Sequence, residues 1–178
     1  KKKYFLYVGN AYPHKNLERL IDAFSQIIAK DNSAKLVLVG KEDYFYKKLK
    51  QNISVMKVSN SIIFFGEAND RELSWLYSNA IALVFPSLME GFGLPAIEAM
   101  ENKCLLLVSD IPVFKEICKD VPFYFDPYNT HDIAEKMAEV YSESSKYQDK
   151  IKLGIERAKD FSWKKMAQET LQVYSSVL

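Results

Sequence analysis

Six short runs of apolar residues limit what this chain can fold into more than any other feature. They are YFLYVG (4–9), KLVLVG (35–40), SIIFFG (61–66), IALVFP (81–86), CLLLVS (104–109) and VPFYFDP (121–127). Runs without polar alternation are typical of strands that are covered on both faces. Three of these runs stop at glycine. In parallel sheets, ligands bind at the carboxyl ends of the strands, where such loops begin.

Segments of helical period separate these runs. Between the first two runs, apolar residues recur at three- and four-residue steps: Leu17, Leu20, Ile21, Phe24, Ile27 and Ile28. RELSWLYSNA repeats the pattern before the fourth run. Such alternation implies right-handed crossovers between parallel strands. The sequence therefore predicts an α/β fold with a Rossmann-like, doubly wound parallel sheet of about six strands.

After about residue 129 the apolar runs end and helical period continues to the last residues. The three segments are HDIAEKMAEVYSES, KYQDKIKLGIERAKDF and SWKKMAQETLQVYSSVL. We expect these helices to cover the edge of the sheet, the last one beginning after Ser162 as its N-cap. No internal repeat or linker interrupts the pattern, so residues 1–178 are predicted to form a single domain.

Composition excludes several classes of protein. The net charge is +1 and lysines are interleaved with acids, which leaves no basic stripe for a nucleic acid. Cys104 and Cys118 lack metal-ligand spacing and are expected to pack as small apolar groups in a reducing cytoplasm. No apolar run approaches the roughly 18 residues of a membrane span. The first strand begins almost at the first residue, so we expect one piece of a longer protein.

The stretch PSLMEGFGLPAIEAM (86–100) carries the clearest chemical pattern. Gly91 and Gly93 allow a ligand to approach the backbone closely, and Pro95 suits the first turn of a helix. The amides of Gly93 and Leu94, together with the positive end of the helix dipole, would bind a phosphate. We therefore predict an anion site where the fourth strand passes into its helix.

Two acids flank this predicted anion site. Glu90 lies in the loop, and Glu98 is expected within the first turn of the helix. Carboxylates accept hydrogen bonds from sugar hydroxyls, so two of them beside a phosphate site could hold both ends of a nucleotide sugar. Less specific interpretations also exist: Glu98 could interact only with its own helix dipole, and Glu90 could be a solvated loop acid.

Two other enzyme classes were weighed against this interpretation. Glu90 and Glu98 could be the acid pair of a glycosidase, which needs carboxyl groups about 5 to 9.5 Å apart. The phosphate-type turn between them argues against that, because a glycosidase has no anion to bind. A dinucleotide oxidoreductase is disfavoured because GNAYPH after the first run is not a G-x-G-x-x-G motif.

The chain resembles a known family over nearly its whole length: the retaining nucleotide-sugar glycosyltransferases of the GT-B fold, family 4, and in particular their C-terminal donor-binding domain. Besides the E-x7-E element, the motifs that carry the resemblance are YVGNAYPHKNLERLIDAF, LVLVG, FFGEANDRELSWLYSNA, FPSLMEGFGLPAIEAM, SDIPVFKEI, FDPYN and FSWKKMAQETLQVY. One short motif would be weak evidence. This ordered series is specific.

The resemblance implies roles for particular residues. Glu98 matches the acid that holds the ribose hydroxyls, and Glu90 the acid near the hydroxyls of the transferred sugar. Lys15 matches the lysine that binds the diphosphate and stabilises its charge as it leaves. A fixed ammonium aimed at a departing diphosphate would lower the barrier to transfer. Gly91, Phe92, Gly93 and Leu94 match the backbone that contacts sugar and phosphate oxygens, and the segment around Ala68 resembles the base-contacting loop.

The sequence also departs from the family pattern. Asn10 replaces an arginine that many members carry after the first strand, although it could also simply close a turn. His14 stands where relatives often have an arginine and could substitute in part, although a surface histidine is the commoner case. Lys103 and Leu105 replace the usual glycine and proline before the fifth strand. We expect this last pair to alter a turn and leave the chemistry unchanged.

By this resemblance we predict the donor half of a hexosyltransferase, with mannose from GDP-mannose as the first choice and a UDP-sugar as the alternative. It would need no cofactor and no metal. The acceptor, a saccharide or a lipid-linked sugar, would bind a missing N-terminal domain, so this piece alone should be inactive and its final helix could expose an apolar strip. The full-length enzyme would be cytoplasmic. It could associate peripherally with the inner face of the membrane. A nucleotide-sugar binding module without turnover remains an alternative.

Overall fold

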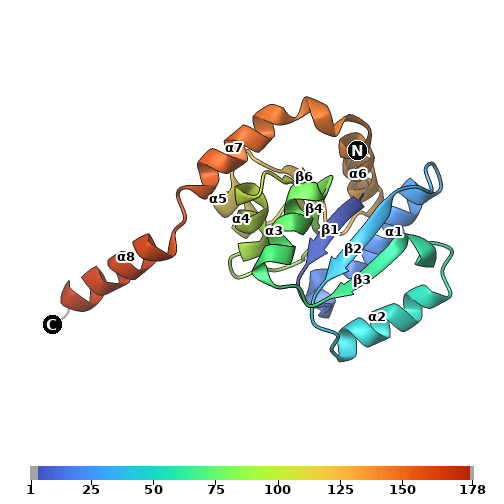
Figure 1. Cartoon of the computed structure of the whole chain (residues 1–178), viewed down its shortest axis with the longest axis horizontal. Coiled ribbons are helices and arrows are strands. Elements are labelled where there is room, and N and C mark those ends of the chain that lie inside the picture. Colours follow the sequence, from blue (N-terminus) through green and yellow to red (C-terminus); the bar gives the residue numbers. More distant parts are fainter. Residues whose placement is uncertain (1–3, 177–178) are drawn as a thin grey trace.

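The six apolar runs form the six strands of one parallel sheet in the computed structural model, which describes residues 4–176 (Figure 1). The strands are β1 (Tyr4–Val8), β2 (Lys35–Val39), β3 (Ile62–Gly66), β4 (Ala82–Phe85), β5 (Leu105–Ser109) and β6 (Phe123–Phe125). Their order across the sheet is β3-β2-β1-β4-β5-β6, and every neighbouring pair is parallel. The predicted doubly wound sheet is confirmed.

Within residues 4–176, eight α-helices connect and flank these strands. They are α1 (Leu17–Ile28), α2 (Tyr44–Ser54), α3 (Asp70–Asn79), α4 (Leu94–Glu101), α5 (Pro112–Cys118), α6 (Thr130–Glu143), α7 (Gln148–Ala158) and α8 (Trp163–Ser176). Short 3-10 turns lie at Pro13–Lys15, Ser59–Ser61 and Ser144–Lys146. Local chemistry sets where helices begin. Asn69 and Glu72 form a capping box at the start of α3, and Asp43 accepts a hydrogen bond from the Tyr46 amide at the start of α2.

The strand order places a topological switch point between β1 and β4. The chain runs outward from β1 to β3, crosses back to β4 beside β1, and then runs outward to β6. Because the strands are parallel, the loops that follow β1 and β4 leave the same edge of the sheet and diverge there. Ligands of open α/β sheets bind in the crevice that such diverging loops leave.

The core is continuous from β3 to β6 and contains both cysteines. The strands contribute fully buried side chains on both faces, among them Phe5, Leu6, Leu38 and Leu107. Cys104 and Cys118 are buried among apolar residues, as the sequence predicted. Burial raises the pKa of the Cys118 thiol to about 12.

The C-terminal helices only partly cover the sheet as expected. α6 packs against α1, and α7 packs against α4, where a side chain at Gly154 would meet Met100 and Val121. The prediction is wrong for α8, which projects away from the remaining elements (Figure 1). Ser162 caps α8 as predicted, because its Oγ accepts a hydrogen bond from the Lys165 amide at 3.0 Å. A cap can therefore start a helix that the fold does not then bury.

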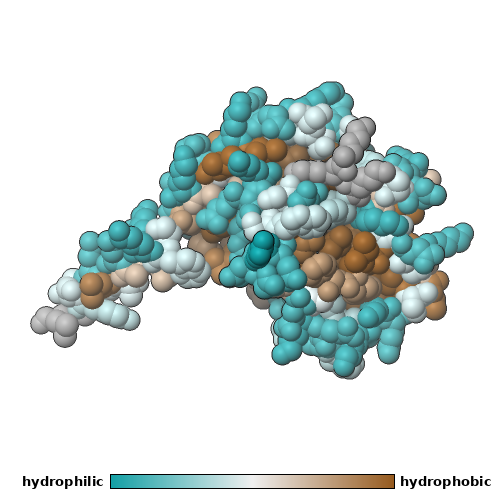
Figure 2. All heavy atoms as spheres, in the orientation of Figure 1, coloured by the Kyte–Doolittle hydropathy of each residue, from teal (hydrophilic) through white to brown (hydrophobic). Residues whose placement is uncertain are grey.

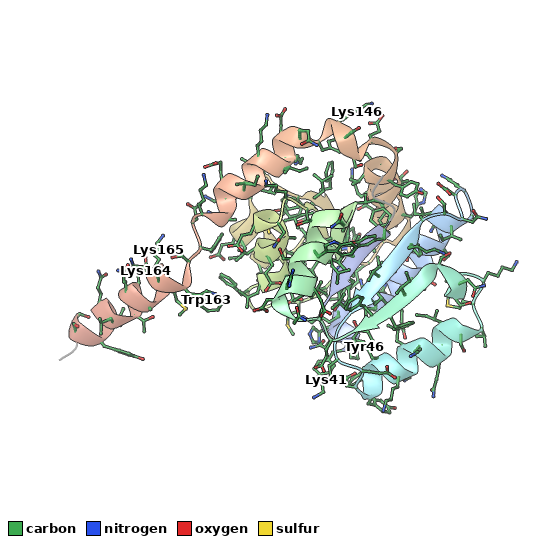
Figure 3. All side chains as sticks on the ribbon, in the orientation of Figure 1. Lys41, Tyr46, Lys146, Trp163, Lys164 and Lys165 are labelled. Atoms are coloured by element: carbon green, nitrogen blue, oxygen red, sulfur yellow. The ribbon has the colours of Figure 1, made fainter. Side chains whose placement is uncertain are left out.

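α8 is exposed along its whole length within residues 4–176. Its apolar side chains have no partner that buries them: Trp163, Met166, Leu171, Val173 and Tyr174. Trp163 is 71% exposed and lies at the start of the helix, beside Lys164 and Lys165 (Figure 3). The predicted apolar strip is thus present.

The edge strand β3 exposes a second apolar area. Ile63 and Phe65 are each more than 40% exposed. Hydrophobic residues gather on the visible face where β2 and β3 lie (Figure 2). Across residues 4–176 no helix is both long and apolar enough to cross a membrane.

Candidate functional site

The loops after β1 and β4 meet at the switch point, as the topology requires. The 3-10 turn Pro13–Lys15 follows β1, and the carbonyl oxygen of His14 accepts a hydrogen bond from the Leu88 amide at 2.8 Å. Leu88 lies in the loop after β4. This bond fixes the two loops against each other, directly beside the residues predicted to bind a ligand.

Lys15 and Glu90 form an ion pair across this junction. Lys15 Nζ lies 2.6 Å from Glu90 Oε1, although the two residues are 75 positions apart in the chain. The side chains are only 13% and 9% exposed, and Nζ also lies 5.7 Å from the centre of the Phe85 ring. The structure therefore brings together the two residues predicted to be catalytic.

Asn16 holds the turn that carries Lys15. Its backbone has a left-handed conformation, with φ of 60°, which asparagine tolerates better than most residues. Its buried side-chain Nδ2 donates hydrogen bonds to the carbonyl oxygens of Pro86 at 3.0 Å and Pro127 at 2.8 Å. The side chain thus ties the first loop to the ends of β4 and β6. Sequence reasoning missed this role.

Two tyrosines, also missed from the sequence, close the start of the first loop. The Tyr46 hydroxyl donates to the Gly9 carbonyl at 3.0 Å, and the Tyr7 hydroxyl donates to the Asn10 carbonyl at 2.6 Å (Tyr46 is labelled in Figure 3). Burial raises the pKa of both phenols, which keeps them protonated as donors. Gly40 fits against this loop only because it lacks a Cβ, which would lie 2.1 Å from the Gly9 carbonyl oxygen.

Four consecutive amides of the fourth loop, the loop after β4, have no partners among residues 4–176. Gly91, Phe92, Gly93 and Leu94 donate no backbone hydrogen bond, and no side chain caps α4. Gly93 is the N-cap with φ of 91°, where an added Cβ would lie 2.8 Å from Cε1 of Phe114. Free amides at a helix N-terminus form a ready-made site for an anion.

Glu98 lies one turn further along α4 than predicted. The helix begins at Leu94, so Glu98 is its fifth residue, and no acid occupies the first turn. The interaction with the helix dipole falls off within the first turn, which weakens the interpretation of Glu98 as a dipole-stabilising acid. Instead, Glu98 Oε2 accepts a hydrogen bond at 2.8 Å from the hydroxyl of Tyr77, a side chain on α3.

Four further predicted site residues form a local turn or pack against neighbouring side chains. Asn10 closes a turn, since its Oδ1 accepts a hydrogen bond from the Tyr12 amide at 3.3 Å. The imidazole of His14 stacks edge-on against Tyr12 with ring centres 6.0 Å apart. Ala68 is half-buried against the core before α3. The Phe92 ring, 43% exposed, contacts Phe161.

The turn after α4 is regular, although Lys103 replaces the family glycine. The Cys104 amide donates to the Ala99 carbonyl and the Lys103 amide to that of Met100, as in a Schellman motif. Lys103 has φ of 59°, the left-handed conformation that glycine adopts at this position without strain. The chain thus forms a regular Schellman turn with a lysine in the left-handed position, and an alteration relative to the family stays a prediction.

A cleft of about 540 Å³ opens beside the fourth loop. Phe92, Leu94, Ile97 and Glu98 line one wall. The other wall is formed by residues 160–162 and the first half of α8. Glu98 is thus held by Tyr77 on one side and lines an open cleft on the other.

These features define a class of protein: a Rossmann-like domain with a candidate anion site, an ion pair and a cleft-lining acid at its switch point. The sequence profile of the family described as "Glycosyl transferases group 1" matches residues 1–157, and the chain belongs to this family.

Curated relatives are longer than this chain. It is 39% identical over 127 residues to the O-antigen chain mannosyltransferase RfbU of Salmonella typhimurium, covering 71% of this chain and 35% of RfbU. It is 28% identical over 173 residues to the O-antigen chain mannosyltransferase B of Escherichia coli, covering 96% of this chain and 45% of that protein. The chain therefore spans less than half the length of these relatives.

Solved structures support the same fold. The chain superposes on sucrose-phosphate synthase from Thermosynechococcus elongatus with a TM-score of 0.89 at 25% identity, over 99% of this chain and 46% of that one. The sheet is accordingly one Rossmann-like half of a GT-B fold.

Proposed function

We propose that this chain is the donor-binding part of a retaining glycosyltransferase that moves a hexose from a nucleoside diphosphate to a saccharide or lipid-linked acceptor. The observation that carries the proposal is the row of unpartnered amides from Gly91 to Leu94, set between the Lys15–Glu90 ion pair and Glu98. These groups match the anionic centre and the flanking hydroxyls of a nucleotide sugar.

Each group has a proposed task in this reaction. The amides and Lys15 bind the diphosphate, and they bind it more strongly as the sugar–phosphate bond breaks and negative charge gathers on the leaving oxygen. Glu90 accepts hydrogen bonds from the transferred sugar, and Glu98 from the ribose. The acceptor attacks the same face of the sugar that the diphosphate leaves, so the anomeric configuration is retained.

Mannose from GDP-mannose is the first choice of donor. Two lines support it: RfbU and mannosyltransferase B are named for mannose transfer, and the P-x-K-N-L first loop from Pro13 to Leu17 is similar to that of bacterial enzymes of surface-polysaccharide synthesis. A UDP-sugar is the alternative. No cofactor or metal is included in the proposed reaction.

The acceptor site is proposed to lie on an N-terminal domain outside this chain, because the relatives are at least twice as long. The exposed apolar residues of α8 would pack on that domain. We infer that this piece alone binds donor weakly and transfers nothing. In the full-length enzyme, Trp163 should become buried and its fluorescence should shift to shorter wavelength relative to this chain. We expect that enzyme in the cytoplasm, where it could associate with the inner face of the membrane.

A nucleotide-sugar binding module without turnover is the second candidate. One observation favours it: Asn10 is engaged in a local turn and supplies no cation where many family members have an arginine. Such a module would bind the same nucleotides, but the full-length protein would not transfer sugar.

Two experiments test the proposal. A thermal-shift panel of GDP-mannose, UDP-glucose, UDP-N-acetylglucosamine and the free diphosphates against this chain should identify the base, with a diphosphate raising the melting temperature. In the full-length protein, Lys15→Ala should lower kcat by about 10²- to 10³-fold, the usual loss when one group that stabilises transition-state charge is removed. Unchanged transfer in Lys15→Ala and Glu98→Ala would contradict the catalytic assignment, and no transfer by the wild type would favour the binding module.

A further inference from the structure

One face of α3 holds Glu98 at two points. Tyr77 donates its hydroxyl hydrogen bond to Glu98 Oε2 at 2.8 Å. Three residues earlier, on the same face of the helix, the Ser74 hydroxyl donates to Asn102 Oδ1. Asn102 Nδ2 in turn donates to the main-chain carbonyl of Glu98 at 2.8 Å. α3 thus restrains both the side chain and, through Asn102, the backbone of this acid.

The bond from Tyr77 leaves half of the carboxylate for other partners. Tyr77 is only 1% exposed, so bulk water does not compete with Glu98 for its hydroxyl. Burial also raises the pKa of this phenol, which keeps it protonated as a donor. Glu98 Oε1 makes no hydrogen bond or ion pair with any residue between 4 and 176. Because Glu98 also lines the cleft, its carboxylate lies beside space that a ligand can occupy.

We propose that Tyr77 is a positioning residue for nucleotide recognition: it fixes the Glu98 carboxylate so that Oε1 is presented to the ribose hydroxyls. This inference rests on the proposed function. A glutamate side chain has three rotatable bonds, and ordering it when a ligand binds costs affinity. A carboxylate already held by a buried phenol avoids that cost, and its direction selects for hydroxyls at one place.

The test compares nucleotides that differ only in those hydroxyls. Calorimetry on this chain would measure dissociation constants for GDP and 2′,3′-dideoxy-GDP, and for UDP and 2′,3′-dideoxy-UDP, since the base is not yet assigned. Hydrogen bonds to a charged group typically contribute enough for a discrimination of about 10-fold or more. In Tyr77→Phe we expect the ratio of the two constants to fall about 10-fold towards one.

A matched control separates positioning from stability. Tyr4 is a second tyrosine whose hydroxyl donates to α3, in its case to the Leu76 carbonyl at 2.7 Å, without contact to Glu98. Tyr4→Phe should lower the melting temperature and leave the discrimination ratio unchanged. Glu98→Gln should lose discrimination as Tyr77→Phe does. Asn102→Ala, which releases the backbone restraint, should lower the ratio by less and serves if Tyr77→Phe does not fold.

The outcomes distinguish this inference from the function on which it rests. If the wild type prefers the ribonucleotide and Tyr77→Phe keeps the full preference, the positioning role is wrong and the proposed function stands. If the wild type binds ribo- and dideoxynucleotides equally, or binds neither, the assignment of Glu98 to ribose fails and the inference fails with it. A loss of preference in Tyr77→Phe but not in Tyr4→Phe is the result we expect.

Discussion

The loops after β1 and β4 meet at one switch point but are built in opposite ways. In the first loop, several polar atoms are already hydrogen-bonded within the protein. Tyr46 and Tyr7 donate to two of its carbonyls, and Asn10 closes a turn. Asn16 donates to carbonyls at the ends of β4 and β6. In the fourth loop, the row of amides from Gly91 to Leu94 stays without partners among the described residues.

The difference separates two tasks. A cation must be held before the ligand arrives, which needs a loop whose own hydrogen bonds are satisfied. An anion site needs donors that the protein itself does not use. The first loop therefore gives Lys15 a fixed position, and the fourth loop keeps its donors available.

The largest effect is expected from Gly93→Ala, which breaks the fourth loop. The added Cβ would meet Phe114 at 2.8 Å in a left-handed backbone. Strain and overpacking together should lower the free energy of unfolding by about 2 to 4 kcal/mol, measured by urea denaturation. Gly91→Ala is the matched control, because its Cβ would meet nothing within 4 Å. Equal losses in both variants would show that the two glycines are not distinguished by packing.

Asn16→Ala should break the first loop at a cost of about 2 kcal/mol in the free energy of unfolding. It removes the donor of two buried hydrogen bonds and leaves the carbonyls of Pro86 and Pro127 without that partner. Asn16→Gly loses the same donor but relaxes the left-handed backbone, so it should cost about 1 kcal/mol less. Chemical denaturation of the three proteins checks the order. Wild-type stability in Asn16→Ala would mean that these bonds do not hold the loop.

Lys103→Gly should stabilise the protein by about 1 kcal/mol, because glycine accepts the left-handed conformation that lysine adopts under strain. The substitution lies at the other end of α4 from the unpartnered amides. The melting temperature should therefore rise while affinity for GDP stays the same. A drop in GDP affinity would indicate that strain in this turn reaches the anion site.

Ser87→Ala is expected to have the smallest effect, between no change and about 1 kcal/mol of stabilisation. Ser87 is the second residue of the fourth loop, and within residues 4–176 its Oγ is the one buried side-chain nitrogen or oxygen that lacks a hydrogen-bond partner. Removing an unsatisfied buried hydroxyl is close to neutral or favourable. Thermal denaturation measures the change, and a loss above 1 kcal/mol would reveal a partner that the serine has in solution.

Much of the fold could be predicted from the sequence because each strand is an unbroken apolar run. All six predicted runs contain a strand, and α1 and α3 lie where the helical period indicated. The position of α8 could not be predicted, since FSWKKMAQETLQVY has the same amphipathic period as a buried helix. A periodic pattern shows that a face can be covered, and not what covers it.

The candidate site was harder to predict than the fold. The sequence identified Lys15 and Glu90 separately, but their contact depends on β1 lying beside β4, which only the topology shows. Tyr77 was missed because RELSWLYSNA was interpreted as an ordinary amphipathic helix with its tyrosine in the core. It is indeed buried, and only the hydroxyl at its tip reaches Glu98.

The buried thiol of Cys118 can report how often the fold opens around it. With a pKa of about 12, only about one thiol in ten thousand would be ionised at pH 8 even if a reagent could reach it, and the side chain is fully covered. Alkylation at this position therefore has to wait until α5 separates from the sheet. Its rate would report how often α5 separates from the sheet.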